Sequence, residues 1–132
     1  MTNKRAVGAA AGLAAVLCVS GLTAAGPAQA KGTTAVRASG TCAVGSGHWS
    51  LKAKADNGLI AIEFEVDTNR VGQRWHVRIT DNTQLVQDRF ATTVAPSGSF
   101  TVRPHTSNRA GVDVIRAKAT RGTRVCAGSV RF

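Results

Sequence analysis

Large apolar residues occupy every second position of the stretch Ile60-Ala61-Ile62-Glu63-Phe64-Glu65-Val66-Asp67. Successive side chains of a β-strand point to opposite faces, so this period of two predicts a strand with one buried face. Asp56-Asn57-Gly58 comes shortly before it and is a strong signal for a tight turn. The same alternation runs through Trp49, Leu51 and Ala53 before that turn. The two segments therefore predict a pair of half-buried strands.

Further short runs follow at intervals of about ten residues, as is common in sandwiches and barrels. Turn-forming clusters such as Asp81-Asn82-Thr83 and Pro96-Ser97-Gly98 separate them, and no helical period stands out. The pattern predicts an all-β fold: an immunoglobulin-like two-sheet sandwich of seven to eight short antiparallel strands, with a small β-barrel as the alternative. An apolar phase slip between Val114 and Ile115 predicts a β-bulge there. The predicted core consists of Trp49, Leu51, Ile60, Ile62, Phe64, Val66, Trp75, Val77, Ile79, Phe90, Phe100, Val102, Val114, Ile115 and Val130.

The N-terminal part of the chain has the three-part layout of a secretory signal peptide. Lys4 and Arg5 precede an apolar run, and the segment ends in Ala28-Gln29-Ala30, an A-x-A cleavage site. We therefore expect residues 1–30 to be a signal peptide, 31–40 a flexible leader and 41–132 a single β-sandwich domain. A retained membrane anchor and lipid attachment at Cys18 are the alternatives. The protein is expected to be secreted and extracellular, with no stable membrane anchor after cleavage.

Two cysteines stay in the chain once the predicted signal peptide is removed. Cys42 and Cys126 lie near the two ends of the predicted domain. In an oxidising compartment two such cysteines should form a disulfide. The bond would close a loop of about 85 residues, worth about 4 kcal/mol in the chain-entropy model. A metal site or a cysteine nucleophile is the alternative, but C-x-x-C spacing and clustered histidines are both missing.

Several motifs span this predicted domain. They run from Cys42 through Trp49-x-Leu51-Lys52-Ala53-Lys54, Glu63-Phe64-Glu65-Val66-Asp67-x-Asn69-Arg70-x-Gly72-Gln73-x-Trp75 and Pro96-Ser97-Gly98-Ser99-Phe100-Thr101-Val102 to Cys126. The chain resembles, on these residues, a family of small secreted actinobacterial proteins of unknown function, and the resemblance covers essentially everything after the signal segment. It implies secretion and a β-sandwich, and it supplies no catalytic or binding residue.

Acidic and basic residues alternate with apolar ones around Glu63 and Trp75. If these two strands form a hairpin, the register that keeps apolar residues together pairs acidic with basic side chains. The pairs would be Glu63 with Arg78, Glu65 with His76, and Asp67 with Arg74. We interpret them as a structural ladder, because opposite charges across a strand pair stabilise it by about 0.2–1 kcal/mol each.

The charge of the chain is strongly basic and unevenly distributed. Without residues 1–30 the chain carries 15 basic and 7 acidic residues, a net charge of +8. Residues 101–132 hold seven of the basic residues and one acidic residue, Asp113, a net charge of +6. Arg116, Lys118 and Arg131 are expected on one surface, and Arg103 and Arg124 complete the candidate binding residues. The alternative is a basic edge that deters aggregation.

The expected function is a non-catalytic binding module for an anionic extracellular surface or partner, either a cell-wall polymer or an acidic extracellular protein. No zinc-binding histidine spacing and no G-x-S-x-G motif occurs, so we expect no enzyme activity, no metal site and no cofactor. Nucleic acid is disfavoured because most aromatic residues are expected to point inward. The alternatives are an inhibitor of an extracellular enzyme, for which the loop Pro104–Gly111 is a candidate, and, less favoured, a small hydrolase.

Overall fold

The computed structural model describes residues 34–132, which form nine β-strands and one short 3-10 turn. The strands are β1 (Val36–Thr41), β2 (His48–Asp56), β3 (Leu59–Asp67), β4 (Arg74–Asp81), β5 (Gln84–Thr92), β6 (Ser99–Val102), β7 (His105–Ser107), β8 (Val114–Arg121) and β9 (Arg124–Arg131), and the turn is η1 (Ala43–Gly45). The predicted signal peptide, residues 1–30, lies outside the described residues. Within 34–132 no helix has the length and hydropathy that crossing a membrane requires.

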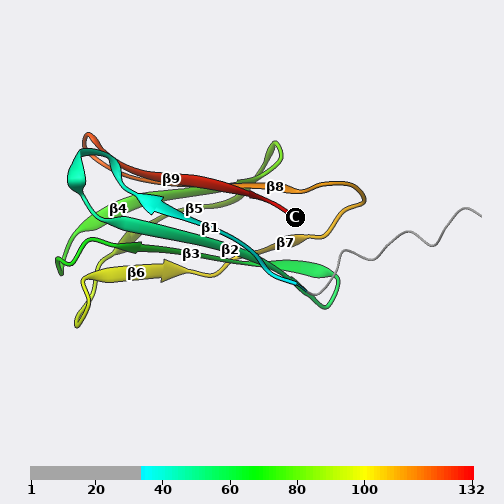
Figure 1. The fold of residues 1–132 in the computed structure, drawn as a ribbon, viewed down its shortest axis with the longest axis horizontal. Coiled ribbons are helices and arrows are strands. Elements are labelled where there is room, and N and C mark those ends of the chain that lie inside the picture. The colour runs from blue at the N-terminus through cyan, green and yellow to red at the C-terminus, as the bar shows by residue number, and fades with distance from the viewer. Residues whose placement is uncertain (1–33) are drawn as a thin grey trace, which may run out of the picture.

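The strands are arranged in two antiparallel sheets that pack face to face (Figure 1). One sheet has the order β1-β2-β3-β6, with β7 also paired to β3, and the other has the order β5-β4-β8-β9. The predicted all-β, immunoglobulin-like two-sheet sandwich is therefore confirmed, with nine strands in place of seven to eight. The alternative of a small β-barrel is wrong, because the two sheets do not join into one closed sheet.

The core lies between the sheets and is filled by alternate residues of each strand. Most of the predicted core residues are buried there, among them Phe64 and Trp75, which are fully inaccessible. Trp49 and Val114 are only partly buried. Phe90 was wrongly assigned to the core: it is 53% exposed on the outer face of β5. β5 is an edge strand in which apolar and polar residues do not alternate regularly. The sequence therefore did not indicate which residues of this strand face the core.

The predicted hairpin between the Glu63 and Trp75 strands is wrong. β3 pairs with β2, so that Glu63 lies opposite Lys52, whereas β4 pairs with β8, so that Arg78 lies opposite Lys118. The connection 68–73 crosses from one sheet to the other. Each strand has one apolar face, and in a sandwich two such strands can face each other across the roughly 10 Å layer instead of lying side by side. Alternation identifies the buried face but not the neighbouring strand.

Two smaller predictions also need correction. β1 occupies residues 36–41, so its first five residues overlap the segment 31–40 that was expected to be a flexible leader. The residues of β1 alternate in burial and pair along β2. A segment rich in small residues, which is typical of linkers, is therefore an edge strand in this protein. The predicted β-bulge at Val114 and Ile115 is absent from the β8–β9 pairing. The register instead shifts between Ile79 and Thr80 in the β4–β5 pair, and β8 starts at Val114 without a slip.

The predicted disulfide between Cys42 and Cys126 is present, with 4.3 Å between the two Cα atoms. Cys42 follows β1 in one sheet and Cys126 lies on β9 in the other, and both are buried. The bond therefore links the two layers at the side where β9 packs against β1 and β2. A disulfide of this kind fits an extracellular protein.

The indole of Trp49 covers this same side of the sandwich. A Cβ atom on Gly128 of β9 would lie 2.0 Å from Cη2 of the Trp49 ring, and one on Gly40 of β1 would lie 3.0 Å from Cε2 of the same ring. Glycine at both positions therefore makes room for the ring between the edges of the two sheets. We expect Gly128→Ala to displace the ring and lower the free energy of unfolding by about 2 kcal/mol, as overpacking typically does.

Urea denaturation of the Gly128→Ala variant checks this expectation. Ser129→Ala is the matched control, since Ser129 lies next to Gly128 on β9 but points outward, and it should leave the midpoint nearly unchanged. Equal stability of the two variants would mean that the indole is not confined by the glycine.

Candidate binding face

The outer face of the β5-β4-β8-β9 sheet gathers basic side chains. Inward residues such as Val77 and Ala117 alternate with outward ones, and the register brings the outward residues of neighbouring strands together. Arg78 lies directly opposite Lys118, and outward residues paired in this way are roughly 5 Å apart at the backbone. We call this surface the basic face; its residues are Arg74 and Arg78 on β4, Arg116 and Lys118 on β8, and Arg131 on β9.

A single carboxylate, that of Asp88 on β5, lies on the basic face. Its Oδ2 is 3.6 Å from Nη1 of Arg78, and its Oδ1 is 2.5 Å from Nε2 of His76. Arg116, Lys118 and Arg131 form no ion pair with any of the described residues. Like charges placed directly opposite each other, such as Arg78 and Lys118, destabilise a strand pair. The positive charge of the basic face therefore does not stabilise the fold.

The outer face of the other sheet is electrically balanced. Its basic residues are matched by an equal number of acidic ones: Arg37, Lys52, Lys54 and Arg103 against Asp56, Glu63, Glu65 and Asp67. Arg103 Nε is 3.2 Å from Glu63 Oε2, and His105 Nε2 is 3.1 Å from Asp56 Oδ2. The excess positive charge of the sandwich is thus concentrated on one sheet.

The predicted binding residues fall into three places. Arg116, Lys118 and Arg131 share the basic face, as the alternation along their strands indicated. Arg103 lies on the balanced face of the other sheet, where it pairs with Glu63. Arg124 lies at the end of the sandwich, where it borders a small pocket together with residues of the η1 and β3–β4 segments. Alternation within a strand shows which residues share a face, but not on which sheet or at which end the strand lies.

The sequence prediction missed Arg74 and Arg78. Both were assigned to acidic partners, Asp67 and Glu63, which lie on the other sheet. The alternation Arg74-x-His76-x-Arg78 was visible as an outward-pointing basic strip. The wrong neighbour for β4 concealed its connection to Arg116 and Lys118.

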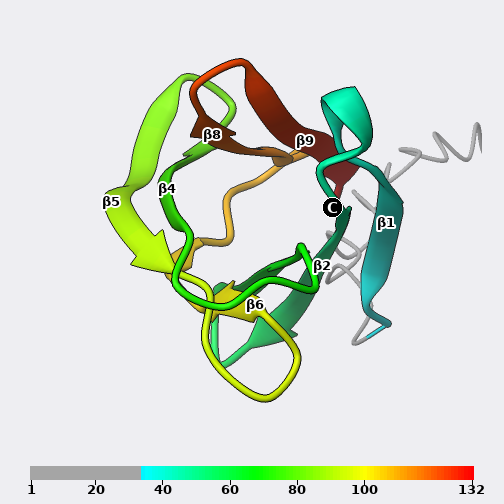
Figure 2. The ribbon, with the colours of Figure 1, turned by 90° about the vertical axis from the view of Figure 1, so that its left-hand side faces the viewer.

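The connections at the end of the sandwich near Arg124 face the viewer in Figure 2, and they carry exposed apolar side chains. Val44 in η1 is 76% exposed and has φ of 60°, a conformation unusual for a β-branched residue. Val71 and Val94 are exposed on the neighbouring β3–β4 and β5–β6 connections. These connections are joined by backbone hydrogen bonds, including the one that Gly72 N–H donates to Thr93 O at 2.8 Å.

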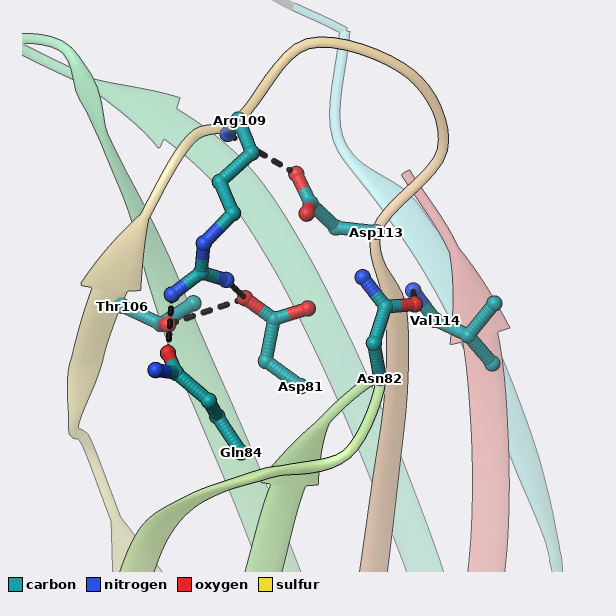
Figure 3. A network of polar contacts seen from close by, with 7 residues as sticks. All are labelled: Asp81, Asn82, Gln84, Thr106, Arg109, Asp113 and Val114. Carbon is teal, nitrogen blue, oxygen red and sulfur yellow. Dashed lines mark hydrogen bonds and ion pairs between the residues drawn. The ribbon is translucent and has the colours of Figure 1, made fainter.

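The opposite end of the sandwich is held by a polar network that fixes the segment Pro104–Gly111 (Figure 3). Part of this segment, predicted as a loop, is strand β7. Arg109 Nη1 and the hydroxyl of Thr106 each donate to Oδ2 of Asp81 at 2.9 Å, and Arg109 Nη2 also donates to Gln84. The Asp81 side chain is fully buried. The Arg109 side chain is thus paired with the buried Asp81, although 39% of it remains exposed.

The two glutamates of β3, the carboxylates that a hydrolase could use, have structural partners. Glu63 accepts a hydrogen bond from Arg103 at 3.2 Å, and Glu65 accepts one from the hydroxyl of Thr101 at 3.3 Å. In residues 34–132 no group of three or more His, Cys, Asp or Glu side chains is placed to hold a metal ion.

Comparisons of the chain with protein family models, with curated proteins and with solved structures find no match. The resemblance to a family of small secreted proteins therefore stays a prediction. Function has to be inferred from the surfaces of the molecule.

Proposed function

We propose that the protein is a secreted, non-catalytic binding module that holds an anionic extracellular polymer against its basic face. The observation that carries this proposal is the separation of charge between the sheets. One outer face is balanced, and the other has five basic residues against Asp88 alone. A repeating anion such as a cell-wall polymer presents many negative groups in a row, which suits a flat array of cations.

The chemistry of the basic face fits phosphate or carboxylate ligands. A guanidinium group binds such anions through two parallel hydrogen bonds, while a lysine ammonium acts as a point charge. Arg116, Lys118 and Arg131 are exposed and have no acidic partner among the described residues, so a ligand does not have to break an ion pair to reach them. Exposed cations of this kind contribute about 1 kcal/mol each near an anionic surface.

Protection of a sheet edge is a weaker explanation for these charges. Charged residues that deter aggregation belong on edge strands, whose backbone groups are unpaired. Arg116 and Lys118 lie on β8, which is paired on both sides, with β4 and with β9. Of the three residues only Arg131 belongs to an edge strand, β9.

The proposed location outside the cell rests on two observations of different kinds. The sequence of residues 1–30 has the layout of a signal peptide, and the Cys42–Cys126 disulfide is of the sort that persists in oxidising compartments.

Charge reversal tests the proposed function. We expect the triple variant R116E/K118E/R131E to lose about 3 kcal/mol of binding to an anionic cell-wall polymer, roughly a 100-fold weaker affinity. R37E/K54E/R103E is the matched control, because it changes the net charge equally but on the outer face of the other sheet. Retention on purified cell walls and equilibrium binding, each at low and high salt, provide the measurement.

The outcomes separate the two leading functions. Equal loss in both variants would mean that only the total charge matters, and unchanged retention of R116E/K118E/R131E would reject the basic face. The second candidate, an inhibitor of an extracellular enzyme, is favoured by the exposed Val44, Val71 and Val94 on ordered end connections. Capture of a defined enzyme that persists at high salt and survives charge reversal would support that candidate, because packed interfaces depend little on screened charges.

A further inference from the structure

Phe90 is an aromatic side chain exposed on the basic face. It lies directly opposite His76 of β4 and is 53% exposed. The Cζ atom of Arg74 lies 4.1 Å from the centre of the Phe90 ring, and the His76 ring centre is 5.0 Å away. Because β5 is the edge of its sheet, no strand of that sheet lies on the far side of the ring. The Arg74 guanidinium therefore lies over the Phe90 ring, and the exposed 53% of Phe90 is the part that a ligand can contact.

The groups around Phe90 include acceptors as well as donors. Asp88 precedes Phe90 by two residues on β5 and so shares its face, where it contacts both His76 and Arg78. An ionised carboxylate only accepts hydrogen bonds, so it suits the hydroxyl groups of a ligand. The guanidinium groups of Arg74 and Arg78 suit carboxylates. Hydroxyls and carboxylates occur together on acidic sugars.

We propose that the ligand of the basic face is an acidic polysaccharide, with one sugar ring stacked on Phe90. This inference rests on the proposed function and narrows its ligand class. The C–H groups on one side of a pyranose ring carry partial positive charge, and the face of an aromatic ring is negative, so the two surfaces attract. Asp88 accepts hydrogen bonds from the sugar hydroxyls, and Arg74 and Arg78 bind the acidic group.

The structure favours this ligand over two other polyanions. A polyphosphate has no apolar ring for Phe90 and no hydroxyl groups that could donate to the Asp88 carboxylate. A single-stranded nucleic acid could stack a base on Phe90, but such binders use several aromatic platforms along a groove. Phe90 is the only exposed phenylalanine or tryptophan on the basic face in the described part of the chain.

Binding of three probes to the protein and its variants tests the inference. The probes are polygalacturonate, inorganic polyphosphate and a single-stranded oligonucleotide at equal charge concentration. We expect Phe90→Ala to weaken polygalacturonate binding about tenfold and to change polyphosphate binding by less than about twofold. Phe90→Trp should retain binding of polygalacturonate. Leu85→Ala is the matched control, because Leu85 lies on the same strand and is also 53% exposed, and it should change neither affinity.

The outcomes distinguish this inference from the proposed function. If the unaltered protein binds polyphosphate but not polygalacturonate, the proposed function stands and the sugar inference fails. If neither polymer binds, both fail. An equal loss for both polymers in Phe90→Ala would reject a sugar-specific role, and tighter, Phe90-dependent binding of the oligonucleotide would assign the face to nucleic acid. Unfolding temperatures within a few degrees of each other would show that the variants remain folded.

Discussion

Replacement of both bonded cysteines, C42A/C126A, is expected to lower the free energy of unfolding by about 4 kcal/mol. The two cysteines are 84 residues apart in sequence, so the bond closes a loop that contains most of the folded domain and removes many conformations from the unfolded chain. Small domains have a total stability of about 5–15 kcal/mol, so the loss is a large fraction. For a domain of this size it corresponds to a fall in Tm of roughly 20 °C.

Reduction of the unaltered protein provides the control for this variant. A reductant should reproduce most of the loss in the parent protein and have no further effect on C42A/C126A. The bond also links β9 to the sheet that contains β1, and β1 is an edge strand that pairs only with β2. In C42A/C126A, amide hydrogen exchange should therefore increase first in β1. A loss below about 1 kcal/mol, or a variant as sensitive to reductant as the parent, would contradict a stabilising role of the bond.

Local alternation was sufficient to predict the layers of the fold. In β3 and β4 each buried residue is followed by one that faces outward, and the sequence shows this without ambiguity. A sheet of short strands with one apolar face has to bury that face against another layer. This requirement predicted the two-sheet sandwich. Partners within a sheet were not predictable in the same way, because any two strands of this kind bury their apolar faces equally well.

The same limit explains what was predicted of the basic face. Arg116 and Lys118 belong to one strand, and alternation alone places them together. Arg74 and Arg78 join them only through the pairing of β4 with β8, a contact between segments about 40 residues apart. The position of Phe90 was hidden for another reason: its strand has no regular period, and its exposure depends on β5 being an edge.

The partnership of Asp81 and Arg109 gave no signal in the sequence. The two residues are 28 positions apart, Asp81 in a turn-forming cluster and Arg109 in a segment predicted as a loop, and neither pattern indicates the other residue. A fully buried carboxylate must nevertheless be paired, because an isolated charge in the interior is costly. Such a pair can be recognised only when burial is known.

Arg109→Ala is expected to lower the free energy of unfolding by about 3 kcal/mol, because it leaves the Asp81 charge buried without its cationic partner. Asp81 would retain one hydrogen bond from Thr106, while its Oδ1 already has no hydrogen-bond partner in the described structure. The variant would also remove the hydrogen bond from the Arg109 side chain to Gln84, while the backbone N–H of residue 109 would still donate to Asp113. Urea denaturation at neutral pH measures the loss.

The matched control is Arg103→Ala, which removes an arginine from an exposed ion pair. The Arg103–Glu63 and Arg109–Asp81 pairs have similar distances, 3.2 and 2.9 Å, but 42% of the Glu63 side chain is exposed against 0% of Asp81. Exposed pairs contribute about 0–1 kcal/mol, so Arg103→Ala should cost far less. Asp81→Asn should then be harmful alone but neutral or stabilising when combined with Arg109→Ala, because it removes the unpaired charge. Equal losses in the two arginine variants, or additive losses in D81N/R109A, would show that burial of the Asp81 charge is not what makes Arg109 necessary.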